Sequence, residues 1–62
     1  MKKEFKKAIK RAWKRNTSNI GFMVSLLVEL QELTKKDPSL AEQALEILDH
    51  FWFEFYLGKK FV

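Results

Sequence analysis

The chain has 62 residues, no cysteine and a formal net charge of +4. This length fits one small domain, close to the lower limit for folding without disulfides or a bound metal. The absence of cysteine excludes a disulfide framework and a thiolate metal site. It allows a reducing compartment but does not identify one, so the cellular location stays undefined. With 47% hydrophobic and 15% aromatic residues, we expect a folded chain.

The charge is divided unevenly along the chain. Residues 1–16 hold eight Lys or Arg against a single acid, Glu4, whereas residues 17–62 hold four Lys against seven acids. This division predicts either attraction within the fold or an exposed basic face that binds an anion.

Residues 2–16 are predicted to form the first helix. Their apolar side chains recur three and four residues apart and make one narrow stripe, namely Phe5, Ala8, Ile9, Ala12 and Trp13. Lysines cover the other face, and their mutual repulsion opposes the helix, so packing of the stripe must offset that cost. A polar turn, N-T-S-N, follows at residues 16–19, with Thr17 or Ser18 as the cap of the next helix.

The second helix is predicted at residues 20–36, and its apolar side chains cover about two thirds of the helical wheel. This breadth is typical of a central helix with two neighbours, or of one that keeps an apolar margin for a partner. Phe22 and Leu33 lie at that margin.

The third helix is predicted at residues 38–57, with Asp37 as cap, Pro38 in the first turn and Gly58 as the stop. Its expected core stripe comprises Leu40, Ala41, Ala44, Leu45, Ile47, Leu48, Phe51, Trp52, Phe55 and Tyr56. Phe53 and Leu57 project from the polar side, where no contact within the bundle is expected. Phe61 is expected to fold back onto the bundle.

Three helices joined by short loops predict an all-α fold, an antiparallel up-down-up three-helix bundle, as a single domain over residues 1–62. The longest mostly apolar run, residues 20–28, is far below the ~20 residues that a membrane span needs. The basic leader lacks a small-residue cleavage site, so we expect neither a signal peptide nor a spanning helix.

The residues that could support catalysis are poorly arranged for it. His50 is the only histidine, and Glu46 and Glu54 lie four residues on either side of it. Three ligands on successive turns of one helix cannot readily surround a metal ion. No serine lies in a nucleophile elbow, and no glycine-rich loop could hold a phosphate. We therefore expect no enzyme activity, no metal and no cofactor.

The segment K-K-D-P-S-L-A-E-Q-A-L-E-I-L, the N-T-S-N loop and the Gly58 stop resemble de novo designed three-helix mini-proteins of the binder type. The resemblance implies a protein target, engaged by a rigid helical face, and no catalysis. Gly21 inside a helix, the run F-W-F-E-F-Y-L and the F-V ending depart from that style and leave a natural origin open.

We therefore expect a small protein-binding module that engages a protein partner, or a second copy of itself, through an exposed apolar face. Phe53 and Leu57 are the expected anchors, with Phe22 and Leu33 as a second patch.

The alternative is a nucleic-acid-associated protein that uses the basic face of the first helix. Its candidate residues are Lys3, Lys7, Lys10, Arg11 and Lys14. Few arginines and no known nucleic-acid-binding motif make this less favoured. A homo-oligomeric structural bundle and a membrane-active cationic protein are further alternatives, the last disfavoured by the eight acidic residues.

Overall fold

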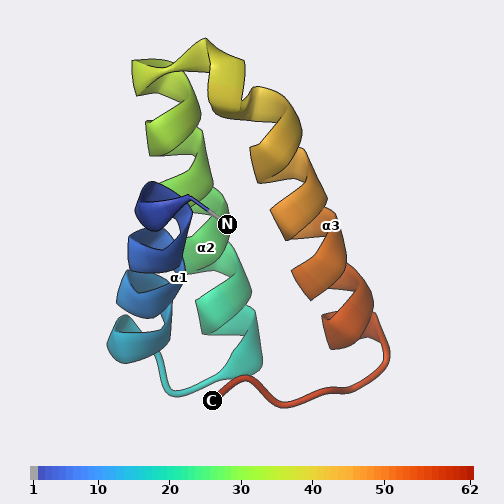
Figure 1. Ribbon diagram of the computed structural model, residues 1–62. Coiled ribbons are helices and arrows are strands. Elements are labelled where there is room, and N and C mark those ends of the chain that lie inside the picture. The colour runs from blue at the N-terminus through green and yellow to red at the C-terminus, as the bar shows by residue number, and fades with distance from the viewer. Residues whose placement is uncertain (1) are drawn as a thin grey trace.

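The computed structural model describes residues 2–62, which form three α-helices and one short 3₁₀ turn. The elements are α1 (Lys3–Arg15), α2 (Asn19–Lys36), η1 (Pro38–Leu40) and α3 (Ala41–Tyr56). Successive helices run in opposite directions (Figure 1). The predicted all-α, antiparallel three-helix bundle is confirmed.

The helix α2 is the centre of the bundle. It packs against α1 on one side and α3 on the other, whereas α1 and α3 share no extensive interface (Figure 1). The broad apolar surface of α2 is explained in part by these two neighbours.

The ends of the helices follow from local hydrogen bonds. Ser18 caps α2 by accepting from the backbone N–H of Gly21 at 3.1 Å, and α2 begins at Asn19, one residue earlier than predicted. Asp37 accepts from the N–H of Ser39 at 3.1 Å. This cap begins η1, so the third helix, predicted as continuous from residue 38, is a 3₁₀ turn followed by α3.

Gly58 ends α3 with a positive φ of 84°, as predicted. Its N–H donates to the carbonyl of Phe55, and the N–H of Lys59 donates to the carbonyl of Glu54, both at 3.0 Å. This pair of bonds is a Schellman motif, which satisfies the last carbonyls of the helix and turns the chain back towards α2.

The core lies around the face of α2 that meets both neighbours. Its buried side chains are Phe5, Ala8, Ala12, Phe22, Met23, Leu26, Leu30, Leu40 and Ala44. Phe22 contacts Phe51 edge-on and lies against Phe61, with ring centroids 5.5 and 5.1 Å apart. Phe61 thus folds back onto the bundle, as expected.

Two sets of side chains differ from the sequence-based expectation. Phe22, expected at an exposed margin, is only 2% exposed. Four side chains expected in core stripes are more than half exposed, namely Trp13, Leu45, Trp52 and Tyr56. The reason is the open arrangement of the helices. Because α1 and α3 each pack mainly on α2, each keeps an uncovered flank that a closed bundle would bury.

Candidate functional site: an apolar groove between α2 and α3

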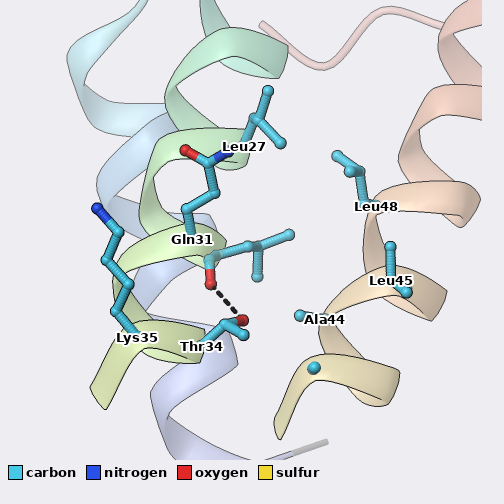
Figure 2. A pocket seen from close by; sticks show the side chains of 9 residues that line it. Leu27, Gln31, Thr34, Lys35, Ala44, Leu45 and Leu48 are labelled. Atoms are coloured by element: carbon cyan, nitrogen blue, oxygen red, sulfur yellow. Dashed lines mark hydrogen bonds between the residues drawn. The ribbon is translucent and has the colours of Figure 1, made fainter. Parts of the chain in front are cut away.

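An elongated apolar groove runs between α2 and α3. Its end near η1 is lined by Leu27, Leu30, Gln31, Thr34, Lys35, Ala41, Ala44, Leu45 and Leu48 (Figure 2). Its other end is lined by Ile20, Met23, Val24, Leu27, Leu48, Asp49 and Trp52. Leu27 and Leu48 belong to both ends, so the two hollows form one continuous surface.

The α2 wall is aliphatic. Ile20, Val24 and Leu27 are 56%, 56% and 40% exposed, and Val28 beside them is 49% exposed. Their spacing places all four on one face of α2, which α1 and α3 leave free. This face is the apolar margin that the sequence left open as an alternative, but it consists of other residues than the predicted Phe22 and Leu33.

The α3 wall adds aromatic surface. Leu45 is 65% exposed and Trp52 56%, and the 81% exposed Tyr56 lies beside Trp52 in the adjoining hollow. Trp52 stacks on Phe55 at a centroid distance of 5.7 Å, and this contact orients the indole while leaving its outer face open. The wall therefore presents one large ring, that of Trp52, which is already held in place.

The outer flank of α3 holds Phe53, which is 62% exposed. Phe53 lines a second, shallow hollow with Glu46, Asp49, His50, Trp52 and Tyr56. Phe53, one of the predicted anchors, thus lies next to the groove wall. Neither Glu46 nor Asp49 makes an ion pair within residues 2–62.

The other predicted anchors lie elsewhere. Leu57 is 62% exposed but follows the end of α3, outside the groove. Leu33 is partly buried against the core, and Phe22 is buried. Of the four predicted anchors, only Phe53 borders the groove. The groove residues on α2 were missed because a single helical wheel cannot show which part of a broad apolar surface the neighbours cover.

The polar side chains of the groove are few. The hydroxyl of Thr34 donates to the carbonyl of Leu30 at 2.8 Å, so it is satisfied within α2 (Figure 2). Lys35 extends over the flank of α2 that faces away from α3 (Figure 2), and its Nζ lies 3.9 Å from the carboxylate of Glu32. Both side chains of this pair are exposed, so the contact is weak.

The basic face of α1 lies outside the groove. Its lysines are unpaired with acids of the described residues, whereas its arginines bind an acid of α2. Lys3, Lys7, Lys10 and Lys14 are exposed. Arg11, predicted with them, donates instead to Glu29 of α2 at 2.8 Å, and Arg15 bonds the same carboxylate. The hydrogen bond from Arg11 holds the pKa of Glu29 below its ordinary value of 4.5; burial opposes this effect, and Arg15 adds to it. The arginines therefore serve the attraction within the fold that the charge division predicted.

Within residues 2–62, no three His, Cys, Asp or Glu side chains gather closely enough to hold a metal ion. None of the helices in this described part has the length and apolar character required to cross a lipid bilayer.

Comparison with known proteins gave no match to a family model, to a curated protein or to a solved structure.

Proposed function

We infer that the protein is a small helical binding module that engages a protein partner through the apolar face formed by α2 and α3. The observation that carries this inference is the exposure of large apolar side chains along the whole groove, from Ile20 and Val24 on α2 to Leu45 and Trp52 on α3. Such a contiguous apolar surface is rare on monomeric proteins except at binding sites.

The shape of the groove supports a helix as the element that is bound. The apolar residues of each wall recur at alternating spacings of four and three, as in Ile20, Val24 and Leu27 on α2 and in Leu45, Leu48 and Trp52 on α3. Two parallel rows of this kind accept a third row of side chains from an amphipathic helix. The module would then complete a helical bundle with its partner.

A selection of displayed amphipathic helical peptides tests this proposal, with the purified protein as bait. We expect the selected peptides to lose at least tenfold in affinity when Leu45 or Val24 is changed to Gln, as loss of a packed apolar contact predicts. Leu57→Gln is the matched control, because Leu57 has nearly the same exposure outside the groove. Failure to obtain any binder, or binders insensitive to both groove variants, would contradict the proposal.

The second candidate is nucleic-acid binding by α1. The observation that favours it is that the exposed Lys3, Lys7, Lys10 and Lys14 make no ion pair within residues 2–62. Lysines in this number can follow a phosphate backbone without reading bases. The ion pair between Arg11 and Glu29 weakens the candidate, because it neutralises one of the predicted cations.

A further inference from the structure

The two walls of the groove differ in their charged residues and in their kinds of apolar side chain. The α2 wall is aliphatic and ends in Lys35, whose Nζ has only a weak contact of 3.9 Å with Glu32, whereas the α3 wall contains the ring of Trp52. Neither Lys nor Arg occurs within α3, whose exposed charges near the groove are Glu42, Glu46 and Asp49. Lys35 of the α2 wall therefore has the charge to attract an acid of α3, and the apolar rows of the two walls can pack against each other.

The two ends of the groove also differ. Lys35 and Ala41 line the end near η1, and Glu42 follows Ala41 directly. Ile20 and Trp52 line the opposite end, which is apolar apart from Asp49. An occupant that matches this surface must present charge at one end and apolar side chains at the other.

We propose that the groove binds the same groove of a second copy of this chain, related by a two-fold axis parallel to α2 and α3. The rotation places α2 of each copy over α3 of the other, and each residue keeps its height along the axis. This inference rests on the proposed function, because it names the occupant of the same surface. The result is a four-helix core in which every α2 has an α3 on either side and all neighbouring helices are antiparallel.

The outer flanks of the helices meet favourably in this arrangement. On a wheel of 100° per residue, Lys35 points away from α3, and Glu42 and Phe53 point away from α2. Figure 2 shows Lys35 on this outer flank. The rotation brings the outer flank that carries Lys35 beside the flank that carries Glu42 of the partner subunit, since Lys35 and Ala41 line the same end of the groove. At the other end it brings Phe53 onto the aliphatic row that includes Val24 of the partner subunit.

The other two-fold arrangement fits poorly. An axis perpendicular to the helices would place α3 over α3, with Glu46 and Asp49 facing the same acids of the second copy. It would also place the charged Lys35 over the apolar end of the groove at Ile20. Facing like charges and a desolvated ammonium group both oppose association.

The area of the exposed apolar surface is close to what a stable dimer needs. The surface comprises five groove residues and two residues of the adjoining hollow, and their exposure ranges from 40% to 81%. The groove residues are Ile20, Val24, Leu27, Leu45 and Trp52, and those of the adjoining hollow are Phe53 and Tyr56. This corresponds to about 700 Å², taking roughly 200 Å² for each aromatic and somewhat over 100 Å² for each aliphatic side chain. A standard interface buries about 800 Å² per partner.

The solution mass over a dilution series tests the proposal directly. Light scattering and sedimentation equilibrium from roughly 1 to 200 µM should show a species of twice the 7.4 kDa chain mass, since interfaces of this size reach micromolar affinity or better. Leu45→Gln should weaken the dimer at least tenfold, whereas Leu57→Gln, 62% exposed against 65% for Leu45, should leave it unchanged. Melting curves of both variants confirm that each is folded.

A charge-swap experiment tests the arrangement of the copies. Lys35→Glu alone and Glu42→Lys alone should each weaken the homodimer about tenfold, because symmetry makes two repulsive pairs in each case. Mixing the two variants should restore association, because only the mixed dimer pairs opposite charges at both positions. If neither substitution changed the affinity of the homodimer, the proposed arrangement would be overturned.

The outcomes separate this inference from the proposed function. A monomer at every concentration that still binds amphipathic peptides at Leu45 and Val24 overturns the second copy as occupant and leaves the binding module intact. A monomer that binds no helix overturns both. A dimer that Leu45→Gln weakens, and that the mixed charge variants re-form, supports both.

Discussion

The backbone N–H of Phe61 donates a hydrogen bond of 2.8 Å to the side-chain carbonyl of Asn19, the first residue of α2. The amide nitrogen of Asn19 in turn donates to the carbonyl of Lys59 at 2.7 Å. Asn19 thus binds the segment after Gly58 from both sides and holds the Phe61 ring against Phe22. These contacts join the start of α2 to the last residues of the chain, about 40 positions apart in the sequence.

Asn19 and Phe61 both stabilise this end of the bundle, so removal of either side chain should lower the free energy of unfolding. Phe61→Ala should lower the free energy of unfolding by about 2 kcal/mol, less than for a fully buried ring because Phe61 is half-buried. Asn19→Ala should cost about 1 kcal/mol through the two lost hydrogen bonds. Urea unfolding followed by circular dichroism measures both changes. If the double variant lost the full sum of the two single losses, Asn19 and Phe61 would not be coupled.

Gly21→Ala is expected to have an unusual effect on stability. Within a helix, Gly→Ala normally stabilises by about 0.5–1 kcal/mol. Here an added Cβ would lie 2.7 Å from Oδ1 of Asn16, whose amide donates to the Ala12 carbonyl at 2.7 Å and to the Ser25 hydroxyl at 2.8 Å. Gly21→Ala should therefore fail to stabilise the native protein, because Asn16 must give up these bonds.

The same substitution should become more favourable once Asn16 is removed. In the Asn16→Ala background the added Cβ still lies 3.0 Å from Oγ of Ser18, so Gly21→Ala should change the free energy of unfolding more favourably than it does in the native protein, without reaching the full gain of an uncrowded helix position. Thermal and urea unfolding of the four proteins in this cycle give the coupling between the two positions. A gain of equal size in both backgrounds would show that Asn16 does not constrain position 21.

The sequence predicted the fold well because each signal for it is local. Asp37, Gly58 and the apolar spacing of residues 2–16 act on backbone and side chains within a few positions. The site was predicted less well, because exposure depends on how the helices are placed. A periodic stripe shows that Trp52 and Tyr56 share a face with Phe55, but not that α2 covers only one edge of that face. The exposure of Phe53 could be predicted because Phe53 interrupts a polar face, a contrast that the sequence itself displays.

The lowered pKa of Glu29 should make the stability of the protein depend on pH. Its pKa is lowered in the folded protein, chiefly by the hydrogen bond from Arg11, so its contribution is present above the ordinary pKa of 4.5 and is lost as pH falls through the lowered value. Asp37, whose pKa the hydrogen bonds from Ser39 lower, acts in the same direction. The native protein should lose stability between pH 7 and the region below 4.5, and Glu29→Gln should flatten this dependence.

Urea unfolding at several pH values measures the effect of Glu29. At pH 7, Glu29→Gln should be less stable than the native protein by about 1 kcal/mol or less, because both arginine side chains are about half exposed. The two proteins should converge in acid, where Glu29 is protonated. Parallel curves across the whole range would assign the acid sensitivity to Asp37 or other carboxylates instead.

Changes on the outer flank of α3 and on the basic face of α1 should affect protein association differently. Phe53→Ser should weaken protein association about tenfold, because it removes an exposed ring beside the groove. Reversal of Lys7, Lys10 and Lys14 to Glu should change the association constant by no more than about twofold, because these lysines lie on α1, away from the groove, and act only through long-range charge. Sedimentation equilibrium measures both variants.

The same two variants separate protein binding from the nucleic-acid alternative. Fluorescence anisotropy with a short single-stranded oligonucleotide, and with a duplex of the same sequence, should show no tight binding by the native protein at physiological salt. Strong binding that falls steeply with salt and is abolished by the lysine reversal would favour the nucleic-acid reading. Full protein association by Phe53→Ser would remove Phe53 from the interface and contradict its place beside Val24 of the partner subunit.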